Sequence, residues 1–388
     1  MAQGAHRAAE AAFPVILPQL TSIRFFLALG VVLFHYQLQW PWDSMQATGL
    51  LDRARLGVDA FFILSGFVLT HAYRRALEAG EFSYGRFLVA RFARIYPAHL
   101  VILVFVLAMV AGATLLGADF DRNFYNPLGL LATVLLVQAW LPEVITAEWN
   151  GPSWSLSAEW FAYLTFPASA WLGFTLRRKP VLLLALVAAL FVGLDLLYQA
   201  TVGKLLVHAE ANMGILRIIP DFLYGVALYR LGERMTINRG AAAIGAWAAA
   251  IALLVLMHLK ADDRLIVVMC GPLVLALALL AKAGSGGPLV SPALLIGGEA
   301  SYALYLVHMP ILIAWKGIIS AIGDVDSHYT LAWWEVACLL PLSIAASLAI
   351  HIGFEGPART WIRHQADRVW PSPLARAQMP SGSQPPDV

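Results

Sequence analysis

The sequence predicts an all-α membrane protein, a bundle of about ten transmembrane helices. Of its 388 residues, 60% are hydrophobic and 13% are charged, about half the charged fraction of a typical soluble domain. Several apolar stretches run for about 20 residues with few or no charges, the length that a helix needs to cross roughly 30 Å of hydrocarbon. Composition and stretch length together place the chain in a lipid bilayer.

Eleven apolar stretches are candidates for these helices. They cover residues 20–39, 56–73, 98–116, 127–141, 154–176, 181–200, 213–229, 241–259, 265–281, 302–322 and 331–352. The stretch 127–141 is the shortest and ends in Leu141-Pro142, so it is the weakest candidate for a crossing.

The distribution of basic residues decides the topology, because lysine and arginine are enriched in cytoplasmic segments. If the N-terminus is cytoplasmic and stretch 127–141 does not cross, most of the 26 lysines and arginines are cytoplasmic. A full crossing there would put the cluster 177–179 outside. We therefore expect ten spans with both termini cytoplasmic. The outer segment 119–153 then contains a re-entrant or interfacial piece and forms part of an acceptor site.

One membrane domain is expected over residues 20–358, between a cytoplasmic segment, 1–19, and a cytoplasmic tail, 359–388, that is largely disordered. No metal site is indicated, because Cys270 and Cys338 lie in apolar runs without metal-ligand spacing. Both are expected to be buried free thiols. The net charge of +2 and scattered basic residues give no nucleic-acid surface.

The first helix carries two ionisable residues on one face. Arg24 and His35 are eleven residues apart, almost three turns, which separates them by roughly 16 Å along the axis. A cation at the cytoplasmic mouth and an imidazole deeper on the same wall suit a long anionic donor. The alternative is a snorkelling arginine and a core histidine.

Two carboxylates are candidates to orient such a histidine. Asp59 lies near the outer end of the second helix. The alternative for Asp59 is an acidic residue at a helix start that accepts hydrogen bonds from free backbone N–H groups. Glu159 lies within the apolar run of WSLSAEWFAYLTFP, where a carboxylate without a basic residue on its own helix needs a partner. Arg217 and Asp221, one turn apart, are expected to pair with each other.

Two further patterns suit an anionic ligand. Arg91 and Arg94 lie three residues apart at the cytoplasmic boundary and can fork onto phosphate oxygens, although positive-inside anchoring also explains them. Near the C-terminus, a helix that starts after Gly297-Gly298 presents a polar stripe and an N-terminus suited to phosphate. Its polar residues are Ser301, Tyr302, Tyr305 and His308. The alternative for His308 is a histidine buried in the protein core with its hydrogen bonds satisfied there.

These stretches together resemble the acyltransferase-3 family of membrane O-acyltransferases. The resemblance rests on Arg-x10-His (Arg24, His35) and on the blocks GVDAFFILSGFVLT, RFARIYP, WSLSAEWFAYLTFP, SYALYLVHMPIL and FEGPAR, in that order. They extend over nearly the whole membrane part. The esterase-like outer domain of some members is absent, and the family's acidic pair is reduced to Glu159.

The resemblance implies a ten-helix fold, a cytoplasmic acyl-coenzyme A donor, and a carbohydrate acceptor presented on the outer side. It implies His35 as the catalytic base, with Arg24, Arg91 and Arg94 on the donor. Acyl-coenzyme A, most simply acetyl-coenzyme A, is then a substrate rather than a tightly bound cofactor. The bacterial inner membrane is the implied location. Transfer is expected to be direct, with a covalent relay as the alternative.

A transporter or flippase for a lipid-linked sugar is the rival from another class. It predicts translocation without dependence on coenzyme A, and inverted repeats, which the sequence lacks, would favour it. A structural scaffold gives no reason for Arg24 and His35 on one face.

Overall fold

The computed structural model describes residues 13–41, 48–117, 123–141, 149–323 and 329–369. Helix makes up 82% of the structure, and the described ranges contain no β-strand. The predicted all-α class is therefore confirmed. The disorder expected from residue 371 onward and the first twelve residues of segment 1–19 lie outside the described ranges.

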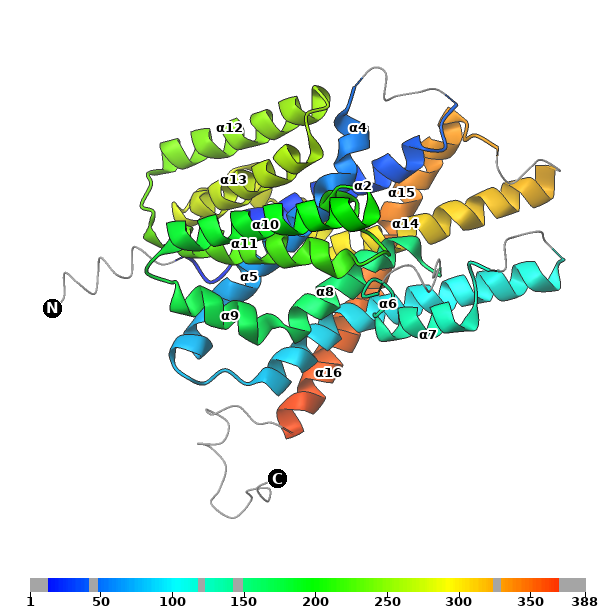
Figure 1. Cartoon of the computed structure of the whole chain (residues 1–388). Coiled ribbons are helices and arrows are strands. Elements are labelled where there is room, and N and C mark those ends of the chain that lie inside the picture. Colours follow the sequence, from blue (N-terminus) through cyan, green and yellow to red (C-terminus); the bar gives the residue numbers. More distant parts are fainter. Residues whose placement is uncertain (1–12, 42–47, 118–122, 142–148, 324–328, 370–388) are drawn as a thin grey trace, which may run out of the picture.

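Eight helical segments in these ranges are long and apolar enough to cross a membrane, and Figure 1 shows them in one bundle. The first four are α2 (Pro18–Gln37), the continuous run α4 (Leu50–Arg53), η1 (Ala54–Leu56) and α5 (Gly57–Glu78), then α6 (Tyr84–Leu115) and α10 (Pro180–Val202). The others are α12 (Arg239–His258), α13 (Asp263–Lys282), α14 (Pro292–Gly323) and the run from α15 (Trp333–Ile350) to α16 (Gly356–Val369). The chain is a multi-pass membrane protein.

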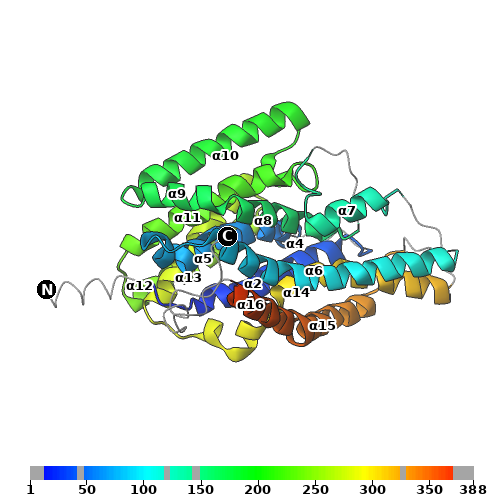
Figure 2. The same cartoon turned by 90° about the horizontal axis from the view of Figure 1, so that it is seen from below.

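The two remaining predicted spans are helical but shorter or more polar. One is α8 (Trp154–Leu164) followed by α9 (Phe166–Thr175). The break between them lies just before Pro167, which has no N–H for the helix ladder. The other is α11 (Gly214–Arg234), whose ionisable side chains lower its hydropathy. Both stretches lie within the bundle (Figure 2). Each of the ten predicted spans thus corresponds to a helical stretch in the described ranges, although only eight of these are long and apolar enough to cross a membrane.

Residues 127–141 do not form a crossing helix, as predicted. The helix α7 (Pro127–Leu135) has nine residues, a rise of about 14 Å. It ends at Leu136, whose φ of 56° is left-handed. His99 of α6 donates to the Thr133 carbonyl oxygen at 2.9 Å, which holds α7 beside α6.

Contacts between helix ends define two ends of the bundle. At the first, here called the basic end, Arg74 of α5 pairs with Glu233 of α11 at 2.7 Å. Lys282 of α13 donates to the Met235 carbonyl oxygen at 2.8 Å. The connections α5–α6, α9–α10 and α11–α12 gather at this end, on the left of Figure 1. It corresponds to the side predicted to be cytoplasmic.

The opposite end is tied together around one carboxylate. Asp263, at the start of α13, pairs with Arg53 at 2.8 Å and Arg55 at 2.6 Å. His208, in η3 (Leu206–His208), lies 2.8 Å from the same carboxylate. The start of α5 and the segment before α11 therefore meet α13 here.

Glycines allow the closest helix contacts. A methyl group at Gly66 of α5 would overlap the Phe222 carbonyl oxygen of α11, and one at Gly225 of α11 would overlap the Ile63 carbonyl oxygen. Gly298 brings α14 equally close to α2 at Thr21. Lipid tails are as apolar as the helices, so the hydrophobic effect does not drive helix association in a membrane. Small residues stabilise such contacts instead, because they allow close van der Waals packing.

Replacing Gly66 by alanine should therefore separate α5 from α11. We expect Gly66→Ala to lower both the amount of monodisperse protein in detergent and its melting temperature. The added methyl group would overlap backbone atoms, which cannot move aside as the end of a flexible side chain can. Gly112→Ala is the matched control, since nothing lies within 4 Å of that position. Equal melting temperatures for the two variants would contradict the expectation.

One expectation about the cysteines is wrong. Cys270 is buried, but Cys338 is exposed. Cys338 lies on α15, which buries only a few of its residues against the bundle. An apolar run in a membrane helix can face lipid, so its apolarity does not indicate burial in protein.

Candidate functional site

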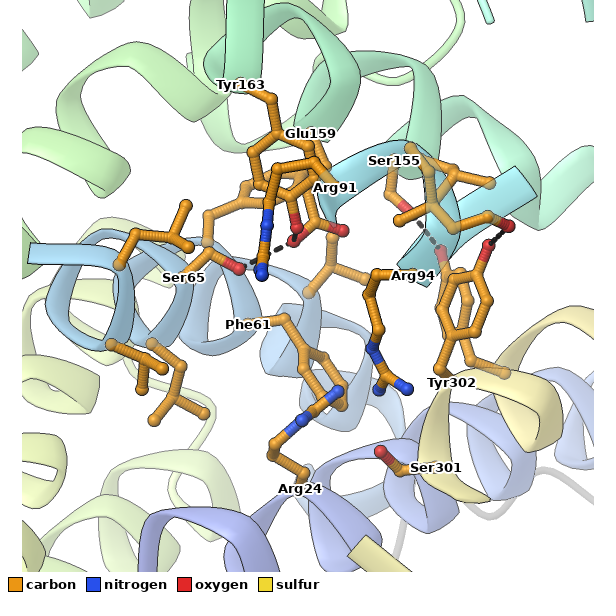
Figure 3. Close-up of a pocket in the computed structure, with 18 residues that line it drawn as sticks. Arg24, Phe61, Ser65, Arg91, Arg94, Ser155, Glu159, Tyr163, Ser301 and Tyr302 are labelled. Atoms are coloured by element: carbon orange, nitrogen blue, oxygen red, sulfur yellow. Dashed lines mark hydrogen bonds between the residues drawn. The ribbon is translucent and has the colours of Figure 1, made fainter. Parts of the chain in front are cut away.

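A cavity of about 130 Å³ lies among α2, α5, α6, α8 and α14, toward the basic end. We call it the arginine pocket. Its polar lining consists of Arg24, Ser65, Arg91, Arg94, Ser155, Glu159, Tyr163, Ser301, Tyr302 and Tyr305. All six residues predicted to bind the donor are therefore in its wall, together with Glu159. Figure 3 shows the three guanidinium groups directed into one space.

Two of the three guanidinium groups make no direct ion pair with a carboxylate of the described residues. Within the described part of the chain, Arg24 and Arg91 make no hydrogen bond or ion pair. Arg91 lies 5.9 Å from the Tyr73 ring centroid and 5.8 Å from that of Tyr163. Cations set against aromatic rings and lacking carboxylate partners favour an anionic ligand.

Arg94 is held by a carboxylate that the sequence did not single out. Between α15 and α16 the chain forms one π-helical turn, His351–Glu355. The Glu355 side chain is fully buried and accepts from Nη1 of Arg94. His351 Nδ1 lies 3.1 Å from the same carboxylate. The sequence signal for Glu355 was its place in the block FEGPAR. The pairing with Arg94 could not be predicted from it, because nothing in the local sequence indicates a π turn.

Glu159 belongs to the arginine pocket and does not touch His35. Its Oε1 accepts from the hydroxyls of Ser65 at 2.7 Å and Tyr163 at 2.6 Å. Arg24 interacts with it electrostatically. The carboxylate therefore offsets part of the positive charge of the pocket.

A second and larger cavity, about 450 Å³, lies toward the opposite end. We call it the histidine pocket. Its charged, imidazole and amide side chains are those of His35, Arg55, Gln138, His208, Glu210 and Arg217, and the phenol of Tyr305 also lines it. Gln138 belongs to the outer segment 119–153, which the sequence assigned to an acceptor site.

His35 is oriented by a backbone carbonyl and a second histidine. Its Nδ1 lies 2.9 Å from the Val31 carbonyl oxygen and 3.1 Å from Nε2 of His308. A carbonyl oxygen can only accept, so we assign the hydrogen to Nδ1. In the neutral ring Nε2 is then the basic nitrogen.

His308 is fully buried on α14 (Pro292–Gly323), two residues before Pro310, which lies inside this helix. Proline has no N–H, so the carbonyl oxygen of Leu306, four residues earlier, loses its helical donor. The side-chain Nδ2 of Asn150 supplies that hydrogen bond at 3.1 Å. The turn before α8 is thereby fastened to α14 beside the two histidines.

The two pockets adjoin. Val58 and Tyr305 line both, and the Tyr305 hydroxyl donates to the Pro152 carbonyl oxygen at 2.9 Å. The helix α2 places Arg24 in one pocket and His35 in the other. Their eleven-residue spacing predicted a shared helix face along one wall, and not a division between two pockets. A partition one side chain thick therefore separates a cationic chamber from a histidine.

The pairing expected for two carboxylates differs in the structure. Asp59 accepts from Nε and Nη2 of Arg217, each at 2.7 Å, and both side chains are buried. Asp59 thus does not orient His35, and the ion pair of Arg217 is with Asp59 rather than with Asp221. Arg217 lies beside Asp59 because Gly66 and Gly225 bring α5 and α11 together, a contact that helical spacing alone cannot reveal.

Removing one partner of this buried pair should be costly. We expect Asp59→Ala to destabilise the protein by about 3–5 kcal/mol, because Arg217 would keep its charge in an apolar surrounding. The double variant Asp59→Ala, Arg217→Met should recover part of the loss. Thermal unfolding in detergent checks both expectations, and a double variant no more stable than the single one would contradict a direct pairing.

The family model of an acyltransferase domain, acyltransferase-3, matches residues 17–352. The chain belongs to the acyltransferase-3 family. The match covers both pockets, the described helices from α2 to α15 and the first residues of the π turn. No solved structure matches the chain.

Two of the three relatives described here for this acyltransferase-3 chain are named as acyltransferases. "Acyltransferase MdmB" of Streptomyces mycarofaciens is 43% identical over 161 residues, 39% of either chain. "Protein 2 in picA locus" of Rhizobium radiobacter is 34% identical over 143 residues, 34% of this chain and 74% of its own length. A protein of Staphylococcus aureus named as an O-acetyltransferase is 28% identical over 125 residues, 32% of this chain and 18% of its own length. The matched segments thus cover well under two thirds of the first relative's length.

Proposed function

We propose that this acyltransferase-3 protein moves an acyl group from acyl-coenzyme A to a hydroxyl of a carbohydrate acceptor. The observation that carries the proposal is the juxtaposition of two chambers. One holds two guanidinium groups that form no ion pair within the described ranges, and the other holds a histidine whose basic nitrogen has no hydrogen-bond partner there. A polyanionic donor and a hydroxyl acceptor are the ligands that these two chambers suit.

The donor is proposed to enter from the basic end. The arginine pocket, at about 130 Å³, accommodates only part of acyl-coenzyme A, so the nucleotide stays outside it. Arg363 of α16 interacts electrostatically with Arg91 and Arg94 of this pocket and with Arg359, so the two α16 arginines add positive charge near it. Phosphate oxygens would bind the unpaired guanidinium groups of Arg24 and Arg91 through charge-assisted hydrogen bonds.

His35 is proposed to act as general base. Its Nε2 takes the proton of the acceptor hydroxyl while the hydroxyl oxygen attacks the thioester carbonyl carbon. This attack forms a tetrahedral intermediate. When the intermediate collapses, the carbon–sulfur bond breaks and the coenzyme A thiolate takes the proton from His35. An ester and free coenzyme A result. The Val31 carbonyl oxygen and His308 hold the ring in the required tautomer, in place of Asp59 or Glu159.

The acyl group is proposed to be acetyl and the location the bacterial inner membrane. The name of the Staphylococcus aureus relative, an O-acetyltransferase, supports the first proposal. The basic end of the bundle supports a cytoplasmic donor side through the positive-inside rule.

Coenzyme A release tests the proposed function. Purified protein in nanodiscs receives acetyl-coenzyme A and a panel of sugar acceptors, and free thiol is measured. We expect release that depends on the acceptor. Folded protein that neither binds acetyl-coenzyme A nor releases thiol, but moves a lipid-linked sugar across a vesicle membrane, would establish the transporter instead.

A further inference from the structure

The histidine pocket differs from the arginine pocket in the charge that it leaves unpaired. Both of its guanidinium groups have carboxylate partners, Arg55 with Asp263 at 2.6 Å and Arg217 with Asp59 at 2.7 Å. The carboxylate of Glu210 lines the same pocket and is exposed. It makes no hydrogen bond or ion pair with the described part of the chain, although Arg217 interacts with it electrostatically.

The pocket also holds a carbonyl oxygen without a donor. Gln138 lines it and is only 6% exposed. Its Nε2 donates to the Ser153 carbonyl oxygen at 3.0 Å and to the Ser153 hydroxyl at 3.1 Å. These two bonds fix which way the amide points. Its Oε1 has no hydrogen-bond partner in the described ranges, an exception among buried polar groups that calls for a ligand or a water.

Three groups that line this pocket and lack a hydrogen-bond partner in the described ranges are acceptors of hydrogen bonds. They are the Oε1 of Gln138, the carboxylate of Glu210 and the Nε2 of His35. A ligand that satisfies all three must donate several hydrogen bonds, as a polyhydroxyl ring does. An anionic ligand would be repelled by the nearby carboxylate of Glu210. It would also lose its hydration without forming an ion pair with a cation of the pocket.

We propose that the histidine pocket binds a non-anionic polyhydroxyl unit, held by Gln138 and Glu210 with one hydroxyl directed to His35. The inference rests on the proposed acyl transfer and specifies its acceptor. Glu210 is then a specificity-determining residue that rejects uronic acids, phosphorylated sugars and other anionic units. The opposite polarity of the two pockets keeps the anionic donor out of the acceptor chamber.

Matched acceptor pairs test this assignment. The protein in nanodiscs receives acetyl-coenzyme A with the methyl glycosides of glucose, galactose and mannose, and separately with those of the corresponding uronic acids. We expect thiol release with at least one neutral glycoside and at least ten-fold lower kcat/KM with its uronic acid. Glu210→Gln should reduce that ratio by about ten-fold or more, mainly by admitting the uronic acid.

Two controls separate specificity from damage. Glu81→Gln removes the same charge from an exposed loop position at the basic end and should leave the ratio unchanged. Gln138→Met should raise the KM for the neutral glycoside while the KM for acetyl-coenzyme A stays constant. Since Gln138 also binds Ser153 and its loss can perturb folding, Glu210→Gln, an exposed position without hydrogen bonds, is the decisive variant.

The outcomes distinguish this inference from the function on which it rests. Turnover confined to uronic acids, or a ratio that Glu210→Gln leaves unchanged, would overturn the acceptor assignment and leave acyl transfer standing. Thiol release with no member of either set would count against the proposed function and this inference together.

Discussion

Replacing His35 by alanine should lower kcat for acyl transfer by about 10³-fold, within the range of 10²–10⁴ that a positioned general base contributes. The alanine variant leaves the acceptor hydroxyl without a proton acceptor next to the thioester. The arginine pocket contains no His35 atom, so the affinity for acetyl-coenzyme A should be unchanged. Stopped-time thiol release and equilibrium donor binding measure the two quantities.

The control for this prediction is His258→Ala. His258 ends α12 and lines neither pocket, so its removal should leave kcat within about two-fold of the wild-type value, a margin far below the effect of a general base. Near-wild-type turnover by a folded His35→Ala protein would exclude His35 as the base. An acyl group found covalently attached to the wild-type chain would instead point to the relay mechanism.

The second large effect concerns the unpaired arginines. Arg24→Met or Arg91→Met should each raise the KM for acetyl-coenzyme A by about 10–100-fold, because one charge-assisted hydrogen bond contributes about 1.5–3 kcal/mol. The kcat at saturating donor should change much less, since the groups that react lie on the other side of Val58 and Tyr305. Initial rates over a range of donor concentrations separate the two parameters.

Arg178→Met is the matched control, because Arg178 is exposed and lies in the connection between α9 and α10 at the same end. It removes an equal charge without touching either pocket and should leave the KM for the donor unchanged. If Arg178→Met and Arg24→Met raise that KM equally, general surface charge attracts the donor, and the pocket has no specific phosphate site.

Much of the fold was accessible from composition and charge. Hydrophobic stretch lengths predicted the long helices, and the arginines near residue 177 excluded a crossing at 127–141. The eleven-residue spacing predicted that Arg24 and His35 project from one face of their helix, but not that they line two different pockets. These features depend on one helix at a time, and helical periodicity describes a single helix well.

The pairings between helices were not accessible in the same way. Asp59 binds Arg217 because two glycine contacts bring α5 against α11, and Glu355 reaches Arg94 through a π turn. His308 of α14 meets His35 of α2 across the helix contact. Each of these depends on how two distant segments pack, which neither propensity nor spacing encodes. The sequence therefore supplied the chemical groups, while their partners required the three-dimensional structure.

The central claim is that donor and acceptor enter from opposite ends and meet beside His35. The test uses proteoliposomes in which the protein has a single orientation, and cleavage at a protease site placed after α16 verifies that orientation. Membrane-impermeant acetyl-coenzyme A is supplied on one side of the membrane and an accepted neutral glycoside on the other. Product is expected only when the donor is on the side of the basic end and the acceptor on the opposite side. Product formed with both substrates confined to the same side, or with their sides exchanged, would contradict the two-chamber arrangement.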